Sequence, residues 1–168
     1  MQRLILTCGV PGSGKSTWAH AYAAQDFGNR IVVSRDVIRF AMVSEDEEYF
    51  SKEKAVFKEF VSQINIALRR GYDVIADATH LNPTSRLKLI NALQLPWSVN
   101  VEVAVIMSDL ETCIAQNELR KGTRSYVPVD VIRKMNNAFV LPEYDEIPQE
   151  YDTIHYIYKK EGEDGVNE

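Results

Sequence analysis

The sequence predicts an α/β fold, in which a parallel sheet of five strands is covered by helices on both faces. Short apolar runs alternate with longer segments of helical periodicity, and short turns with Gly, Asn or Pro separate them. The chain has 168 residues, of which 45% are hydrophobic and 26% charged, as in one globular domain with a core. Alternation of this kind builds a parallel sheet whose ligands bind beyond the carboxyl ends of the strands.

Each element follows from a local pattern. The apolar runs predict strands over 3–8, 31–33, 74–76, 99–107 and 153–158, and helices are expected over 16–25, 37–42, 45–70, 110–120, 128–139 and from 82 onward. Ser44 with Glu47 three residues later matches a capping box, which predicts that the long helix begins near Glu45. Residues 1–160 form the expected domain, and the polar segment 161–168 is expected to be a flexible tail.

Composition narrows the class of protein. Two cysteines, Cys8 and Cys113, have no metal-ligand spacing, and we expect both to be buried thiols in a reducing cytoplasm. No secretory signal or membrane span is predicted, so the expected location is cytoplasmic. A formal net charge of −5 argues against a broad, sequence-independent grip on nucleic acid, although a local basic groove is compatible with it.

A phosphate-binding motif follows the first predicted strand. Residues 9–16 match G-x-x-x-x-G-K-[ST] between a buried strand and a helix, the setting in which backbone amides and a helix N-terminus cradle phosphates. We expect Lys15 to reach the β- and γ-phosphates and Ser16 to place its hydroxyl on Mg²⁺. Thr17 supplies a further hydroxyl or is an ordinary first-turn residue. The residues expected to contact the nucleotide are Gly9, Pro11, Gly12, Ser13, Gly14, Lys15, Ser16 and Thr17.

Asp36 directly follows the second predicted strand. There its carboxylate can accept a proton from an acceptor hydroxyl, or it can cap the short helix that follows. Arg39 lies three residues further on the same helical face, where it can bind an acceptor phosphate or pair with Asp36. Spacing alone leaves both pairs of alternatives open.

Two more segments carry groups suited to phosphoryl transfer. Asp77 ends an apolar run, the arrangement of a carboxylate that holds Mg²⁺, with a plain turn residue as the alternative. Residues 120–124, here called the lid, place Arg120, Lys121 and Arg124 around a glycine. A mobile arginine there would close over the γ-phosphate; a capped helix end explains the first two cations but not Arg124.

Four sequence segments, which occur in the same order, resemble those of a known family. They are residues 9–19, 34–39, 77–83, and 120–123 with 127–132, and together they resemble the kinase domain of bacteriophage polynucleotide 5′-kinase. The resemblance implies an adenylate-kinase-like P-loop fold and transfer of the γ-phosphate of ATP to a polynucleotide 5′-hydroxyl. It also implies that Asp36 is the general base, that Arg39 holds the acceptor's 3′-phosphate with Thr79 nearby, and that a lid arginine contacts the nucleotide phosphates.

The sequence departs from the phage pattern at three points. It contains no D-x-D-x-T phosphatase motif, so we expect phosphorylation only, with phosphatase or ligase steps on separate partner chains. The lid region is a residue longer, which leaves the choice among its cations open. Ala78 stands where the phage enzyme is acidic, and Asp77 is the neighbouring substitute.

Two other functions fit the same motifs. A small-molecule kinase shares the phosphate loop, the aspartate and the lid, and the net charge and the acidic run 45–48 favour it, although such a run is also typical of a solvated helix start. A nucleotide-dependent switch would leave Asp36 and Arg39 without a role, and no N-K-x-D motif is present. A homo-oligomer is compatible with the sequence.

Overall fold

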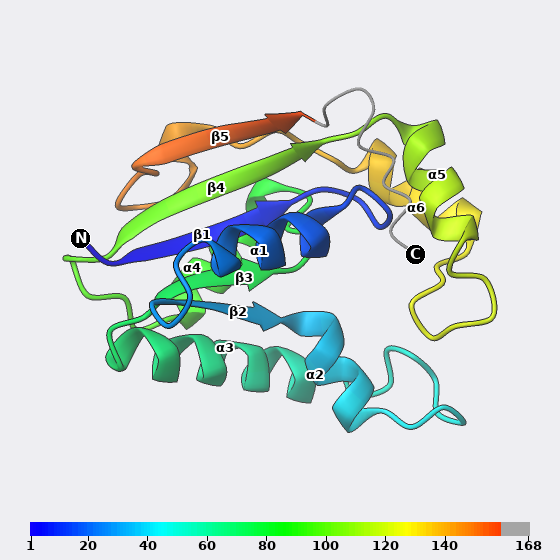
Figure 1. The fold of residues 1–168 in the computed structure, drawn as a ribbon, viewed down its shortest axis with the longest axis horizontal. Helices are drawn as coiled ribbons and strands as arrows, with labels where there is room; N and C mark the ends of the chain where they lie inside the picture. Colours follow the sequence, from blue (N-terminus) through cyan, green and yellow to red (C-terminus); the bar gives the residue numbers. More distant parts are fainter. Residues whose placement is uncertain (159–168) are drawn as a thin grey trace.

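The computed structural model describes residues 1–158, so the expected tail at 161–168 lies outside the described residues. All five strands are parallel, in the order β2-β3-β1-β4-β5 (Figure 1), which confirms the predicted sheet. The strands are β1 Arg3–Cys8, β2 Arg30–Ser34, β3 Asp73–Asp77, β4 Asn100–Met107 and β5 Thr153–Tyr158.

Side chains of the central strand alternate between two cores because successive residues of a strand point to opposite faces. Leu4 and Leu6 join a large cluster with residues of α3 (Glu53–Arg69) and α4 (Pro83–Ala92), whereas Ile5 joins a smaller one with Ala19 of α1 (Lys15–Ala24). Figure 1 shows α1 in front of the sheet and α4 behind it. The helices are α1 Lys15–Ala24, α2 Arg35–Met42, α3 Glu53–Arg69, α4 Pro83–Ala92, α5 Leu110–Glu118 and α6 Val129–Asn137, with a 3₁₀ turn η1 at Tyr144–Glu146.

The carboxyl ends of the strands lie at one edge of the sheet, where the site is expected. α2 directly continues β2, and the phosphate loop leaves β1 at this edge. The segments 43–52 and 119–128, the latter containing the lid, extend from the same side (Figure 1). None of the described helices has the length and apolarity needed to cross a membrane.

The predicted start of the long helix is wrong. α3 begins at Glu53, and the capping-box pair instead closes a turn: the Ser44 amide donates to the Glu47 carboxylate at 2.9 Å. Lys52 Nζ donates to that same carboxylate at 2.9 Å. Because Glu47 is held from both sides, the chain folds back on itself before the helix starts, and Tyr49 is brought against α2.

A buried ion pair supports the strand that leads into the phosphate loop. The Arg86 side chain of α4 is fully buried and pairs with Glu146 of η1, which also accepts from the Tyr151 hydroxyl at 2.7 Å. Arg86 Nη1 donates to the carbonyl of His80 at 2.8 Å. Cys8, beside this pair, is a thiol whose pKa burial raises to about 11, and Cys113 is also a buried thiol, as predicted.

Candidate active site

The phosphate loop joins β1 to α1 and needs its glycines. Gly12 and Gly14 have φ of 82° and 95°, a region that residues with a Cβ rarely adopt. A Cβ on Gly12 would lie 2.2 Å from the carbonyl oxygen of Cys113 in α5, so only glycine fits where loop and helix touch. The backbone can therefore turn its amides inward, as an anion nest requires.

The Lys15 side chain reaches back over the phosphate loop. Its Nζ donates to the carbonyl of Val10 at 2.9 Å. Burial lowers the pKa of Lys15, while the nearby carboxylates of Asp77 and Asp36 oppose that shift. The buried hydroxyl of Ser13 has no hydrogen-bond partner among the described residues, so the loop retains a polar atom suited to a ligand.

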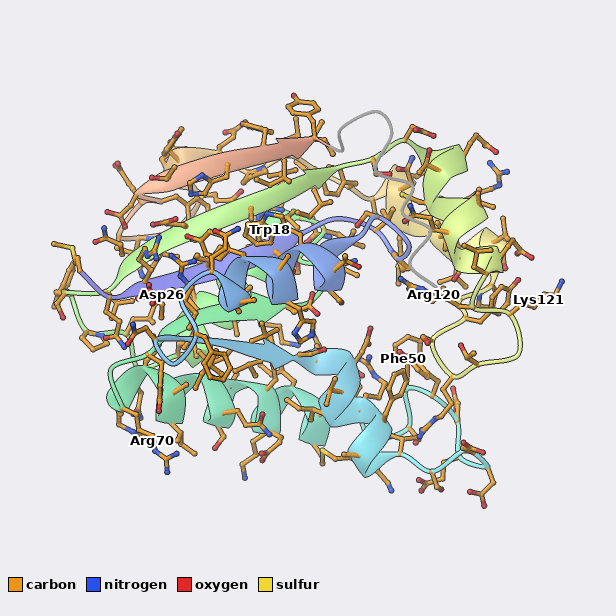
Figure 2. All side chains as sticks on the ribbon, in the orientation of Figure 1. Trp18, Asp26, Phe50, Arg70, Arg120 and Lys121 are labelled. Atoms are coloured by element: carbon orange, nitrogen blue, oxygen red, sulfur yellow. The ribbon has the colours of Figure 1, made fainter. Side chains whose placement is uncertain are left out.

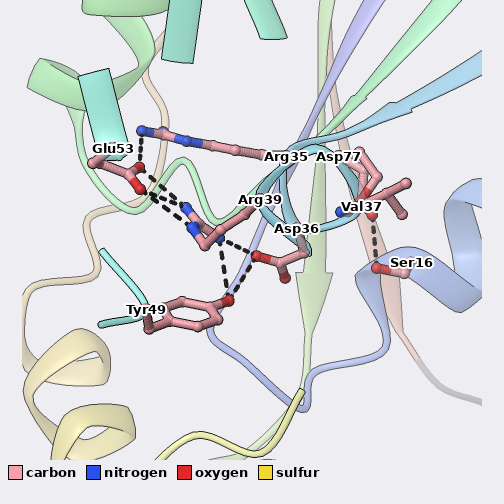
Figure 3. A network of polar contacts seen from close by, with 9 residues as sticks. Ser16, Arg35, Asp36, Val37, Arg39, Tyr49, Glu53 and Asp77 are labelled. Carbon is pink, nitrogen blue, oxygen red and sulfur yellow. Dashed lines mark hydrogen bonds and ion pairs between the residues drawn. The ribbon is translucent and has the colours of Figure 1, made fainter. Parts of the chain in front are cut away.

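Ser16 and Asp77 come together at the base of α1. Ser16 Oγ donates to Asp77 Oδ2 at 2.7 Å (Figure 3), and Thr7 Oγ1 donates to the other carboxylate oxygen at 3.3 Å. A hydroxyl and a carboxylate are ligands that Mg²⁺ prefers, together with phosphate oxygens and water. Ser16 and Asp77 are therefore residues that could hold the ion, and the described part of the chain holds no cluster of three His, Cys, Asp or Glu suited to a metal.

Asp36 stands in the first turn of α2 with its side chain 64% exposed. The cap of α2 is Ser34, whose Oγ accepts from the Val37 amide at 3.4 Å, so the capping alternative for Asp36 is not what the structure shows. Its charge opposes the downward shift that burial gives to the pKa of Lys15. The sheet edge thus places a solvent-accessible carboxylate next to the phosphate loop.

Arg39 is 5% exposed, and each of its three guanidinium nitrogens donates a hydrogen bond. Its Nε and Nη2 donate to the Glu53 carboxylate at 3.2 and 3.0 Å, and its Nη1 donates to Asp36 and, at 3.2 Å, to the Tyr49 hydroxyl (Figure 3). Burial lowers the pKa of Arg39, and the surrounding acids and Tyr49 more than offset this, so the net direction is upward. Of the two sequence alternatives, the structure shows the pairing with Asp36.

The three lid cations take different positions. Arg124 Nη1 donates to the carbonyl of Phe40 at 3.1 Å and Nη2 to that of Val43, so Arg124 binds the end of α2. Figure 2 shows Lys121 pointing outward, where it pairs with Glu118 at 3.7 Å. The positive charge of Arg120 contributes to lowering the pKa of Lys15.

Thr79 lies beside the loop through its main chain, since its carbonyl accepts from the Gly9 amide at 3.0 Å. Three residues near Asp36 were not singled out from the sequence: Tyr49, Phe50 and Glu53. All three fell inside the expected helix 45–70, whose periodicity gave no sign that the chain turns back to α2. The one signal in the sequence was the pair of adjacent aromatic residues, Tyr49 and Phe50, directly after the acidic run 45–48.

A glycine loop of this geometry, between the central strand of a parallel sheet and a helix, defines the class of P-loop nucleotide-binding proteins. The chain belongs to the AAA domain family, whose model AAA_33 matches residues 4–142. Its fold is that of the adenylate-kinase-like NTPases.

The proteins that this chain is similar to include a tRNA kinase, a chain of an RNA repair complex and a sugar kinase. The L-seryl-tRNA(Sec) kinase of Methanococcus maripaludis is 26% identical over 147 residues, 83% of this chain and 53% of the relative. A chain of the Pnkp1/Rnl/Hen1 RNA repair complex superposes with TM-score 0.68 at 22% identity, over 82% of this chain and 43% of that one. A sugar kinase from Janibacter sp. HTCC2649 gives TM-score 0.65 at 16% identity, over 94% and 86%.

The chain spans about half the length of the curated relative that it matches. Family and fold agree that the chain is a P-loop nucleotide-binding domain.

Proposed function

We propose that the protein is a polynucleotide 5′-hydroxyl kinase that transfers the γ-phosphate of ATP to a 5′-OH end of DNA or RNA. The observation that carries the proposal is Asp36. Its exposed carboxylate stands beside the phosphate loop, at the strand end where an acceptor hydroxyl would meet the γ-phosphate. Three of the four segments that resemble polynucleotide 5′-kinase, 9–19, 34–39 and 77–83, begin at the carboxyl end of a strand on this edge.

The donor side of the site is assigned to the loop. The backbone amides between Gly9 and Thr17, other than that of Pro11, which has no N–H, hold the phosphates with Lys15. Arg120 from the lid neutralises charge that develops on the γ-phosphate. Ser16 and Asp77 would hold Mg²⁺, which supplies charge neutralisation when bound. Lys15 Nζ donates to the carbonyl of Val10, and the same ammonium group can donate to a phosphate oxygen instead.

The acceptor side is assigned to Asp36. Its carboxylate takes the proton of the 5′-hydroxyl as that oxygen bonds to the γ-phosphorus, and the bond to the bridging oxygen of ADP breaks. Thr79 lies next to the loop as an acceptor contact. Arg39 is already bound by Glu53, Asp36 and Tyr49, so we assign it to holding Asp36 rather than to the acceptor's 3′-phosphate.

An exposed aromatic ring supports a nucleic-acid acceptor. Phe50 is 52% exposed, packs edge-on against Tyr49 at 4.7 Å and lies 5.4 Å from the Arg39 guanidinium carbon. Figure 2 shows Phe50 in the space between α2 and the segment that contains the lid. Aromatic faces of this kind stack on bases without regard to sequence. We further propose that phosphatase or ligase steps belong to partner chains, as the likeness to an RNA repair complex suggests.

The second candidate is a small-molecule kinase. Four consecutive exposed acids, residues 45–48, lie in the segment that follows α2 and would repel a polyanionic acceptor. The fold likeness to a sugar kinase also covers most of both chains. A neutral hydroxyl compound avoids this repulsion.

Label transfer from γ-labelled ATP with Mg²⁺ tests the proposal. The acceptors are single-stranded DNA and RNA with 5′-hydroxyls, offered beside a mixed metabolite extract. We expect label at the oligonucleotide 5′ end, and Asp36→Asn should lower turnover by about 100- to 10,000-fold while the KM for ATP stays nearly unchanged.

Salt separates the two candidates. The KM of an oligonucleotide should rise steeply with ionic strength as its phosphate contacts are screened, whereas that of a neutral metabolite should not. Label on a metabolite alone would replace the polynucleotide acceptor with a small molecule.

A further inference from the structure

Tyr49 belongs to the polar network around Asp36 (Figure 3), although neither motif nor resemblance assigns it a role. Its hydroxyl donates to Asp36 Oδ1 at 3.1 Å and accepts from Arg39 Nη1 at 3.2 Å. Arg39 Nη1 also donates to the same Asp36 oxygen. One oxygen of the carboxylate is therefore held by two donors that come from two different segments.

The Tyr49 ring is fixed from three sides. It packs edge-on against Phe40 at 6.2 Å and Phe50 at 4.7 Å between centroids, and the Arg39 guanidinium carbon lies 4.8 Å from its centroid. Burial and the charge of Asp36 raise the pKa of Tyr49, so the phenol keeps the proton that it donates. A rigid ring with a retained proton gives the hydrogen bond a fixed direction.

Arg39 is fixed in turn from α3. Both of its outward nitrogens, Nε and Nη2, bind the Glu53 carboxylate, and Glu53 also pairs with Arg35. The side chain of Arg39 cannot rotate without breaking this fork. No hydrogen bond from a described residue reaches Asp36 Oδ2, so the second carboxylate oxygen remains open toward solvent.

We propose that Tyr49 is a positioning residue of the acceptor site: with Arg39 it fixes Oδ1 of Asp36, so that Oδ2 is presented to the acceptor hydroxyl. The inference rests on the proposed function, in which Asp36 is the base. It adds that one of the two donors that orient the base, Tyr49, comes from the segment 43–52 and belongs to none of the sequence motifs. Tyr49 itself contacts no reacting atom.

Tyr49→Phe tests this because it keeps the ring and removes only the hydroxyl. Loss of one oriented hydrogen bond to a charged group should lower kcat for transfer to a 5′-hydroxyl oligonucleotide about tenfold, with the KM for ATP within about twofold. The matched control is Tyr22→Phe. The Tyr22 hydroxyl also accepts from an arginine, Arg3 at 2.8 Å, but at the opposite end of the sheet, and kcat should not change.

A double-mutant cycle separates positioning from a merely structural effect. In the Asp36→Asn background, Tyr49→Phe should change the residual rate by less than about twofold, because the base that it orients is gone. The same fold-loss on both backgrounds, or wild-type kcat in Tyr49→Phe, overturns the proposal.

Failure of the proposed function gives a different result. If the wild-type protein phosphorylates no oligonucleotide, the polynucleotide assignment is wrong. The cycle is then measured on ATP hydrolysis without acceptor, where water takes the acceptor position. Coupling between Tyr49 and Asp36 there supports the positioning role, and additivity overturns it.

Discussion

Gly12 is required for two reasons: its backbone has a positive φ, and a neighbouring helix leaves no room for a Cβ. Its φ of 82° costs a residue with a Cβ about 1 to 2 kcal/mol. A Cβ there would also meet the Cys113 carbonyl at 2.2 Å, a backbone atom that can move only if α5 moves. The loop conformation and the position of the helix that leads into the lid are thus linked at a single position.

We expect Gly12→Ala to lower ATP affinity at least about tenfold, because the loop must open to relieve the contact with α5. Gly28→Ala is the control: φ is 96° there, but no atom lies within 4 Å of a built Cβ. Calorimetric titration with ATP and thermal unfolding measure both variants. ATP binding by Gly12→Ala as tight as by the control would show that the contact with Cys113 does not constrain the loop.

At the scale of elements, α2 is held at both ends. Ser34 caps its start, and at its end the carbonyls of Phe40 and Val43 accept from Arg124, which also lies 4.9 Å over the Phe40 ring. The helix that carries Asp36 is therefore connected to the segment 119–128. The positions of this segment and of the helix that carries Asp36 are linked through the same contact.

Arg124→Leu should make the amides of residues 119–128 exchange with deuterated solvent about tenfold faster, since two hydrogen bonds that tie this segment to α2 are lost. Arg133→Leu is the control, because Arg133 is exposed on α6 and pairs loosely with Glu111 at 3.9 Å. Hydrogen exchange read by mass spectrometry gives the comparison. Equal rates in the two variants would mean that Arg124 does not restrain the segment.

The elements also show what the sequence could and could not predict. The phosphate loop and Asp36 were predictable because each follows directly from a strand end, and in a parallel sheet those ends meet. The start of α3 was not, since Ser44 and Glu47 satisfy the same local pattern in a turn as in a helix. The ion pair between Arg86 and Glu146 could not be predicted from the sequence, because local spacing carries no information on a contact between residues 60 positions apart.

At the scale of the whole molecule, the buried His80 couples folding to pH. Its Nδ1 lies 2.7 Å from the Thr7 carbonyl, which can only accept, so Nδ1 carries the proton in the neutral ring. Burial lowers the pKa of His80 from 6.5 to about 4, although the bond to Thr7 opposes this shift. The unfolded chain therefore binds a proton that the folded chain excludes between those two pH values.

The free energy of unfolding should consequently be highest above about pH 6.5 and fall by about 3 kcal/mol as the pH drops to about 4. Urea unfolding at several pH values measures this slope. His80→Asn, which tolerates the left-handed φ of 42° and retains an N–H donor, should flatten it. Exposed His20→Asn should not. A wild-type slope in His80→Asn would assign the acid sensitivity to other groups.

The strand order has a consequence for how the protein is made. β1 pairs with β3 and β4, so Leu4 lies between Val74 and Val101 in the finished sheet. During synthesis at about 5 to 20 residues per second, this apolar strand leaves the ribosome about 5 to 20 s before its second neighbour exists. Both of its edges can pair with another nascent chain until β3 emerges, and one edge stays open to such pairing until β4 emerges.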